Sequence, residues 1–499
     1  MDLLTYSTVK KMSPQPYYLE NAPERVLQFG AGNFLRGSMD YFIDVLNEKA
    51  GFNGKIAVVQ SVTRGLSSLL NDQEGLYTFY RRGFMDGAPY HEKRIISSIS
   101  RSINSTADFA EVLKTAENEH LRVIVSNTTE IGIQFNPSDK FNDSPPSTFP
   151  GKLTRLLFER YTLFGSVPGK GFIIIPSELL DDNGAELKNC VLKYVEAWGL
   201  CGGFETWLER ENIFCSTLVD GIVSGYPEGE GEKLNAENGY RDELIVTAEP
   251  FSFWAVRAPE SILEDLPFDK VGMPVKVVSD HSNYMQRKKR ILNGTHTTIA
   301  LAAHLAGKET VLDCMNDPIF SRYATDTIYN EILPTLTLPE KEAKDFADAV
   351  VERYKNPYIK HSVMAISLGS IGKWKERLLP SFKKYYENTG KLPRNITFSF
   401  AAMLAFYTGV RFEDGILTGV SNGKEYRIND IAPVLEFFYG IRSLPAREYV
   451  NAVMSNKDFW GENLTLYPGF ARNAACILED IRNRGVNSLL KERMQSNNA

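Results

Sequence analysis

Lys288, Asn293 and His296 supply, within one short stretch, the side chains that reduction of a ketone requires. An ammonium group can donate a proton to the alkoxide that develops when a hydride reaches the carbonyl carbon. Amide and imidazole N–H groups can stabilise the negative oxygen before that proton arrives. Three further cations flank the lysine: Arg287, Lys289 and Arg290. Their charges favour proton loss from Lys288, so the cluster is suited to hydride transfer without a metal.

The geometry expected of these three residues depends on the helix that carries them. On an ideal α-helix Asn293 and His296 share a face because they are three residues apart. His296 is then rotated about 80° from Lys288, and Asn293 about 140°. The rise from Lys288 is about 7.5 Å to Asn293 and about 12 Å to His296, so a substrate would have to bridge the gap. The alternative is a solvated basic helix start with a capping asparagine and a core histidine.

A glycine turn, Gly30-Ala31-Gly32, stands between a predicted strand at 25–29 and a predicted helix. The helix is indicated by apolar residues at steps of four, three and four: Leu35, Met39, Phe42 and Leu46. Backbone N–H groups in such a turn can hold a pyrophosphate, because glycine lets the main chain approach closely. The dinucleotide fingerprint would place a third glycine at position 35, and Gly37 comes two residues late. An ordinary strand-to-helix turn is the alternative.

The end of the second predicted strand bears on the choice between NAD and NADP. A carboxylate there suits the ribose of NAD, whereas a cation suits the extra phosphate of NADP. Residues 60–64 read Gln-Ser-Val-Thr-Arg, with no carboxylate and one arginine, Arg64. The local residues therefore lean slightly towards tolerance of NADP, unless Arg64 is merely solvated.

Strands and helices alternate in the first half of the chain, which predicts an α/β, doubly wound, Rossmann-type domain at 1–285. Its further strands are expected at 56–59, 121–125, 172–175 and 275–278. Long helical patterns follow, at 299–305, 341–354, 396–407 and 446–454. They predict a mainly α-helical substrate-binding and catalytic domain at 286–499. The segment 136–150, rich in Asp, Asn, Ser and Pro, is expected to be a surface loop.

The composition narrows the class of protein. The 499 residues carry a formal charge of -6, which argues against a nucleic-acid partner. The most apolar stretch, 398–407, is too short to span a bilayer, so no membrane association is expected. Five scattered cysteines without ligand spacing predict reduced thiols in a cytoplasmic enzyme, a monomer or small homo-oligomer. The chain contains no HExxH, G-x-S-x-G or P-loop sequence, so zinc, hydrolase and phosphoryl-transfer chemistry are not expected.

Two motifs resemble those of a known family. Residues 29–37, Phe-Gly-Ala-Gly-Asn-Phe-Leu-Arg-Gly, resemble the G-x-G-x-F-x-R-[GA] opening of the polyol-specific long-chain dehydrogenases, the mannitol dehydrogenase family. Lys288-x4-Asn293-x2-His296 resembles that family's K-x4-N-x2-H catalytic motif. Four further stretches resemble members that act on keto-hexuronates: 126–130, 152–160, 214–220 and 353–361. The resemblance runs from about residue 20 to the C-terminus.

The resemblance implies a Rossmann-type N-terminal domain, a helical C-terminal domain and an active site in the cleft between them. It also implies reversible, zinc-independent reduction of a sugar acid, D-tagaturonate, to D-altronate with NADH, in hexuronate catabolism. Lys288 would then be the general acid/base, and Asn293 and His296 would polarise and orient the carbonyl oxygen. Cofactor contacts are expected from Phe29, Gly30, Ala31, Gly32, Asn33, Phe34, Asn127 and Thr128.

The sequence departs from the family pattern at two places near the expected substrate. Polyol members carry an S-C-D-N sequence whose asparagine helps to form the oxyanion site. Residues 176–179 here read Pro-Ser-Glu-Leu, so Leu179 cannot take that role, and Glu178 either faces the substrate hydroxyls or is structural. The family's usual arginine after the Val-Asp pair is replaced by Gly221, which removes part of the polar network near the candidate substrate contact Asp220.

The acid group of the substrate needs a cationic partner. Lys373 matches a lysine that contacts substrate in polyol members and is the first candidate, although a plain surface charge is the alternative. His361 is the second candidate. Three other functions stay open at this point: fructuronate reduction, oxidation of an uncharged polyol such as mannitol, and nucleotide sensing without catalysis.

Overall fold

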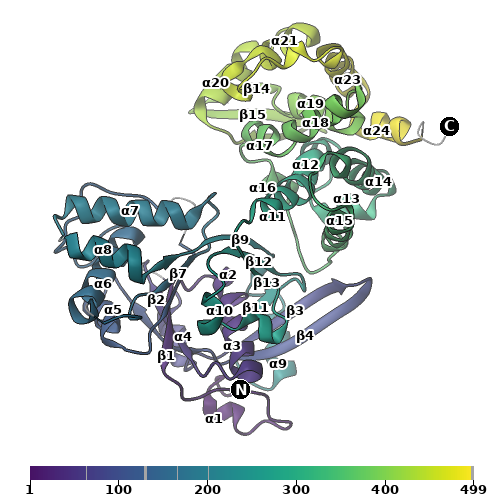
Figure 1. Ribbon diagram of the computed structural model, residues 1–499. Coiled ribbons are helices and arrows are strands. Elements are labelled where there is room, and N and C mark those ends of the chain that lie inside the picture. The colour runs from purple at the N-terminus through teal and green to yellow at the C-terminus, as the bar shows by residue number, and fades with distance from the viewer. Residues whose placement is uncertain (63–64, 129–131, 166, 201, 496–499) are drawn as a thin grey trace. The chain divides into compact units, whose positions relative to one another are not determined.

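The computed structural model describes residues 1–62, 65–128, 132–165, 167–200 and 202–495 (Figure 1). Arg64, Glu130 of the 126–130 stretch and Cys201, one of the five cysteines, lie outside the described residues. The chain divides into two compact units. The first comprises Met1–Gly83 and Ala88–His281, and the second comprises Phe84–Gly87 and Ser282–Ala499.

A parallel sheet of six strands forms the centre of the first unit. In spatial order its strands are β5 (Ile99–Asn104), β2 (Lys55–Gln60), β1 (Glu24–Phe29), β6 (Val123–Ser126), β7 (Ile173–Pro176) and β8 (Ile213–Phe214). The chain moves outward from β1 in one direction through β2 and β5, then returns to the other side of β1 with β6. The predicted doubly wound α/β fold is therefore confirmed, and the direction of winding reverses between β1 and β6.

Both faces of this sheet are buried, which explains why its strands read as continuous apolar runs. Helices α5 (Phe109–Lys114), α6 (Phe149–Phe164), α7 (Asn183–Ala197) and α8 (Gly202–Glu211) cover one face. Figure 1 shows α6, α7 and α8 together on one side of the strands. On the other face, Phe42 and Ile43 of α3 (Met39–Ala50) pack with Val58 and Val125 of the sheet.

Two smaller sheets complete the first unit. One contains, in order, β10 (Val223–Gly225), β11 (Val246–Ala248), β3 (Tyr77–Met85) and β4 (Ala88–Ile96). The other contains β13 (Val275–Val278), β12 (Phe253–Arg257) and β9 (Ser216–Asp220). The strand expected at 275–278 exists, but it pairs with β12 and is not part of the central sheet. Its apolar pattern could not indicate which strand it joins.

The second unit is mainly helical, as predicted. Its core is built on α12 (Gly294–Leu305), α19 (Arg394–Phe406) and α23 (Phe470–Arg484), and α19 contacts both of the others. The predicted helices correspond to α12, α15 (Glu340–Tyr354), α19 and α21 (Ala446–Ser455). The unit also holds an antiparallel sheet that the sequence did not predict: β14 (Gly409–Glu413), β15 (Ile416–Ser421) and β16 (Lys424–Ile428).

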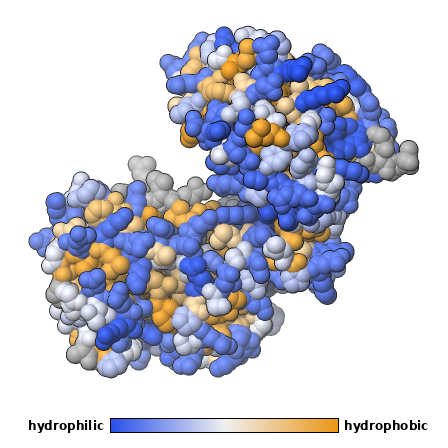
Figure 2. All heavy atoms as spheres, turned by 45° about the horizontal axis from the view of Figure 1, so that its top comes forward, coloured by the Kyte–Doolittle hydropathy of each residue, from blue (hydrophilic) through white to orange (hydrophobic). Residues whose placement is uncertain are grey.

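The surface drawn in Figure 2 mixes hydrophilic and hydrophobic residues on both units. Across the part of the chain that the structure describes, no helix combines the length and the apolar character needed to cross a membrane.

Candidate functional site

The glycine turn lies where the winding of the central sheet reverses. Gly30 follows the carboxyl end of β1, and Asn127 follows the carboxyl end of the neighbouring strand β6. The backbone N–H of Asn127 donates to the carbonyl of Phe29 at 3.1 Å, so the two strand ends are held together. Open α/β sheets bind ligands at this kind of switch point, outside the carboxyl ends of the strands.

Gly30 and Gly32 are glycines for different physical reasons. Gly30 has φ +121°, and a Cβ there would lie 2.8 Å from the backbone oxygen of Asn127. The protein's own packing therefore requires glycine at position 30. Gly32 has an ordinary φ of -69°, and a Cβ there would meet no described atom within 4 Å. The space beside Gly32 is thus open, which fits a backbone that a phosphate group approaches.

The side chains around the turn point to different surroundings. Phe29 is fully buried and packs on Phe149, with ring centroids 5.0 Å apart, so only its backbone faces the turn. The ring of Phe34 stacks on Trp254 at 5.9 Å. The Asn33 Oδ1 accepts a hydrogen bond from Arg36 at 2.8 Å. Of the predicted cofactor residues, these three are therefore engaged in the turn's own packing as well.

The helix expected from Leu35 onward is interrupted, which corrects the sequence interpretation. A short helix, α2 (Asn33–Arg36), ends at Gly37, and α3 begins at Met39. A Cβ on Gly37 would lie 2.7 Å from Val223, so the chain passes very close to β10 at this break. The periodic apolar residues are buried as expected. Side-chain periodicity could not reveal the break, because buried apolar residues recur at helical spacing on both sides of it.

A buried polar group lies beneath the turn. Arg36 donates to the carbonyl of Leu244 at 2.7 Å, and the Tyr77 hydroxyl donates to the carbonyl of Arg36 at 2.6 Å and to Asp40 Oδ2 at 3.2 Å. Burial raises the pKa of Asp40 to about 7. These contacts fasten α2 and α3 to the rest of the unit. Arg36 belongs to the motif at 29–37, but the sequence analysis assigns it no role.

Glu178 fixes the segment that follows β6. Its Oε1 accepts hydrogen bonds from the Thr128 N–H at 3.0 Å and from the Thr128 hydroxyl at 3.1 Å. Its Oε2 accepts from the Ser126 hydroxyl at 3.1 Å. The side chain is buried, which raises its pKa above the ordinary range for a glutamate. These contacts favour the structural alternative for Glu178, while the neighbouring Leu179 is exposed.

Asp220 is the last residue of β9 and is buried. Its backbone pairs with Phe253 of β12, in the sheet that packs against α3. The structure therefore places Asp220, Glu178, the glycine turn, Asn127 and Thr128 in the first unit. It places Lys288, Asn293, His296, His361 and Lys373 in the second.

Lys288 and Asn293 are the first and last residues of a π-helical turn, η3 (Lys288–Asn293). The turn continues α11 (Ser282–Arg287) directly into α12, which carries His296. Hydrogen bonds in a π-helix join residues five apart, so Lys288 and Asn293 lie about one turn from each other on the same side. This differs from the ideal α-helix considered above, which separates them widely around the axis. Such π-turns are frequent at functional sites.

His296 is buried among aromatic and polar side chains of the second unit. The Tyr354 ring centroid lies 4.5 Å from that of His296, and the Tyr354 hydroxyl donates to the carbonyl of Leu292 at 2.7 Å. The His361 imidazole stands edge-on to His296, with centroids 4.6 Å apart. The Nε2 atom of His296 is buried and has no hydrogen-bond partner among the described residues. A buried polar atom without a partner is costly, so this nitrogen is suited to meet a ligand.

The electrostatic environment keeps His296 neutral. Burial lowers its pKa well below the ordinary value, and the positive charges of Arg353 and Arg377 act in the same direction. Burial also lowers the pKa of His361, with a contribution from Lys373. A neutral imidazole can donate one N–H to a developing oxyanion without itself releasing a proton to it.

The structure thus brings His361 into contact with His296 and places the charge of Lys373 near both. The Lys373 ammonium donates to the carbonyl of Ile366 at 2.8 Å. Tyr354 and Arg377 were not identified from the sequence as neighbours of His296. No spacing signal connects them to it, because they lie on α15 and on α17 (Ser370–Arg377), far along the chain.

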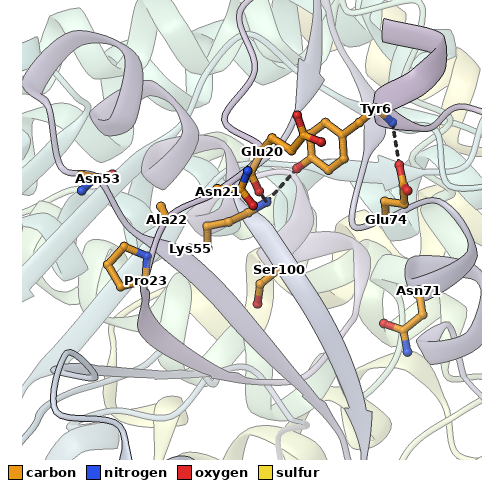
Figure 3. A pocket seen from close by; sticks show the side chains of 10 residues that line it. All are labelled: Tyr6, Glu20, Asn21, Ala22, Pro23, Asn53, Lys55, Asn71, Glu74 and Ser100. Atoms are coloured by element: carbon orange, nitrogen blue, oxygen red, sulfur yellow. Dashed lines mark hydrogen bonds between the residues drawn. The ribbon is translucent and has the colours of Figure 1, made fainter. Parts of the chain in front are cut away.

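A separate pocket of 820 Å³ lies beside the amino end of β2, whereas the glycine turn follows the carboxyl end of β1 (Figure 3). The Lys55 ammonium donates to the Tyr6 hydroxyl at 2.7 Å, the Leu19 carbonyl at 3.1 Å and the Glu20 carbonyl at 3.2 Å. Its three donors are therefore satisfied, and burial lowers its pKa to about 8. These contacts tie the N-terminal segment to the sheet, and the pocket is distinct from the glycine turn.

Comparisons with known proteins agree with this arrangement. Residues 24–270 match the mannitol dehydrogenase Rossmann domain, and residues 280–482 match the mannitol dehydrogenase C-terminal domain. An altronate oxidoreductase of Cronobacter sakazakii is 41% identical over 471 residues, which cover 93% of this chain and 95% of that protein. One from Escherichia coli O7:K1 is 40% identical over 476 residues, which cover 94% and 96%.

Two solved structures share the fold. A mannitol 2-dehydrogenase of Pseudomonas fluorescens, in a ternary complex with NAD and D-mannitol, gives a TM-score of 0.73 at 22% identity, covering 99% of this chain and 100% of that one. A substrate-free D-sorbitol dehydrogenase gives 0.77 at 20% identity, covering 97% and 99%. The two domain matches and the identity to curated relatives along nearly the whole chain lead to one conclusion: the chain belongs to the mannitol dehydrogenase family.

Proposed function

We propose that this protein catalyses the reversible reduction of D-tagaturonate to D-altronate with NADH. The observation that carries the proposal is the identity of about 40% to altronate oxidoreductases, which extends over more than nine-tenths of both chains. The Lys288–Asn293–His296 arrangement supports the same chemistry, because it offers a proton donor and two N–H donors on one helix.

The residues of the first unit fit a dinucleotide. The open space beside Gly32, at the switch point of the sheet, suits a pyrophosphate, and Asn127 and Thr128 stand at the neighbouring strand end. We therefore propose NADH contacts with Phe29, Gly30, Ala31, Gly32, Asn33, Phe34, Asn127 and Thr128. Bound NADH would supply the hydride that converts the keto carbon into a carbinol.

The chain's own residues would manage the oxygen of that carbonyl group. The Asn293 amide and the neutral His296 imidazole, through Nε2–H, donate hydrogen bonds that stabilise the developing negative charge. The Lys288 ammonium then transfers its proton to the same oxygen, which yields the alcohol and a neutral amine. In the reverse direction the amine takes the hydroxyl proton back. Lys373 and His361 are our sequence-derived candidates for contacts with the acid group, and Asp220 for a hydroxyl contact.

The proposal includes NADH as the preferred cofactor, a cytoplasmic setting, and a monomer or small homo-oligomer. The lack of a carboxylate at residues 60–64, at the end of the second strand, leaves NADPH as the competing cofactor.

A substrate and cofactor panel tests the proposal. Purified protein is assayed with tagaturonate, fructuronate and fructose, each with NADH and with NADPH, by following the absorbance of the reduced cofactor. We expect the largest kcat/KM with tagaturonate and NADH. A larger kcat/KM with fructuronate or fructose would replace the proposed substrate. Thermal stabilisation by NADH without turnover of any substrate would indicate nucleotide sensing instead.

A further inference from the structure

Arg377 brings a guanidinium group to the helix that carries Asn293 and His296. It is the last residue of α17, and its Nη1 lies 3.4 Å from the hydroxyl oxygen of Thr297, the residue after His296. A Cβ on Gly294 would lie 3.4 Å from the Arg377 backbone oxygen, so the end of α17 packs on the junction between η3 and α12. Gly294 lies between Asn293 and His296, and Thr297 directly follows His296. Both contacts are therefore next to the proposed oxyanion residues.

The charge of Arg377 is not neutralised within the described part of the protein. Its side chain is half-buried, and among the described residues its guanidinium contacts the Thr297 hydroxyl and forms no ion pair with a carboxylate. Burial lowers its pKa, and two acidic groups act against this shift: the carboxylate of Glu376, which is exposed, and the phenol of Tyr354. A half-buried guanidinium with a single weak contact retains several N–H donors for a ligand.

Two further cations act on His296. Arg353 and Lys373 both act on His296 and on His361 in the same direction as Arg377. Lys373 already donates to a backbone carbonyl, which fixes its ammonium as a point charge. Arginine is the better partner for a carboxylate, because its planar fork can donate two parallel hydrogen bonds to both oxygens.

We infer that Arg377 binds the carboxylate of the sugar acid and thereby selects acids over uncharged polyols. The inference rests on the proposed function for the identity of the substrate. The positive charge of Lys373 attracts the same carboxylate. Arg377 therefore acts together with Lys373 and does not replace it as a candidate. The ketone and the carboxylate are at opposite ends of the open chain of tagaturonate, so Arg377 would orient the substrate while Lys288, Asn293 and His296 act on the ketone.

The test compares Arg377→Gln and Arg377→Lys with the wild type and with a control, Lys375→Gln. The control removes a positive charge from the same helix, two residues away. Calorimetry in the presence of NADH measures the affinity for D-altronate and for altritol, its uncharged counterpart. Steady-state assays measure kcat and KM for tagaturonate and for tagatose. Thermal melting shows whether each variant is folded. If Arg377→Gln does not fold, the affinities and kinetics of Arg377→Lys decide the test.

We expect Arg377→Gln to weaken altronate binding and raise the KM for tagaturonate by about 10- to 100-fold, with altritol and tagatose little affected. Arg377→Lys should lie between wild type and Arg377→Gln, and Lys375→Gln should match wild type. Equal weakening of altronate and altritol would overturn the inference, as would unchanged altronate affinity or a wild type that does not prefer the acid. Preference for altronate that depends on Arg377, without turnover of tagaturonate, would refute the proposed function and leave the inference standing.

Discussion

The imidazole of His361 stands edge-on to the imidazole of His296, with ring centroids 4.6 Å apart and an interplanar angle of 79°. Protonation of either ring would place a positive charge against the other in a buried, already cationic environment. Both rings therefore resist protonation, and burial lowers the pKa of each. The pair supplies a neutral N–H donor next to the proposed oxyanion position.

The first prediction concerns the pH dependence of the reaction. Because the pKa of His296 is depressed, its neutral form persists as the pH falls through the ordinary histidine value of about 6.5. We expect kcat/KM for ketone reduction to show no loss of activity from imidazole protonation between about pH 6 and about pH 9. A pH profile for wild type and for His361→Gln checks this. An acid-side break near the ordinary histidine value in the wild type would contradict the neutral donor.

The second prediction separates the two glycines of the turn. Gly30→Ala forces a Cβ against the Asn127 backbone at an unfavourable φ, so it should destabilise the protein by roughly 1 to 3 kcal/mol. Gly32→Ala adds a methyl group to open space, so thermal stability should be unchanged. We expect its Kd for NADH to rise at least about tenfold, since the methyl group occupies the proposed phosphate position. Calorimetry with NADH and thermal melting measure both effects. Unaltered NADH affinity in Gly32→Ala would place the cofactor elsewhere.

The third prediction decides between the two roles of Glu178. Glu178→Ala removes three hydrogen bonds to Ser126 and Thr128, so it should lower the melting temperature and raise the KM for NADH about tenfold. Glu178→Gln keeps an acceptor for Thr128 and should retain most of the activity. Kinetics with varied NADH and varied tagaturonate distinguish the roles. If Glu178→Gln raised the KM for the sugar alone, the carboxylate would face the substrate.

Much of the fold could be predicted from the sequence because burial leaves apolar runs and apolar periodicity in it. Strand β2, buried along its length, and helix α19, buried on nearly all sides, were both expected. The sheet β14–β16 was missed because its outer strands β14 and β16 are largely exposed and its strands lack a clear apolar alternation. Likewise, apolar periodicity cannot distinguish an α-helical turn from the π-helical turn η3.

The candidate site was predictable only where its residues are close in sequence. Lys288, Asn293 and His296 form a local motif, and the glycine turn follows a strand. The neighbours of His296 from other helices, Tyr354 and Arg377, depend on tertiary packing, and no spacing pattern links them to the motif.

A fourth prediction concerns stability in the second unit. Glu331 accepts the backbone N–H groups of Asn395 at 2.7 Å and Ile396 at 2.9 Å, at the start of α19. Burial raises its pKa from 4.5 to about 7. The folded state therefore favours the protonated form, and this contribution to stability is full below pH 4.5 and is lost as the pH rises through about 7.

Glu331→Gln lacks that titration. The melting temperature of the wild type relative to Glu331→Gln should therefore be highest in acid and should fall between about pH 5 and about pH 8. Thermal melting of both proteins across this range gives the difference directly. A difference that stays constant with pH would show that the carboxyl group does not titrate there.

The central claim is that the Lys288 ammonium protonates the oxygen of the reduced carbonyl group. The most direct measurement is single-turnover reduction of tagaturonate by Lys288→Ala loaded with NADH, with and without added methylamine. We predict that the rate falls by about 100-fold or more, that NADH affinity is nearly unchanged, and that methylamine restores part of the rate. A variant that reduces tagaturonate at a near-normal rate without added amine would contradict the account.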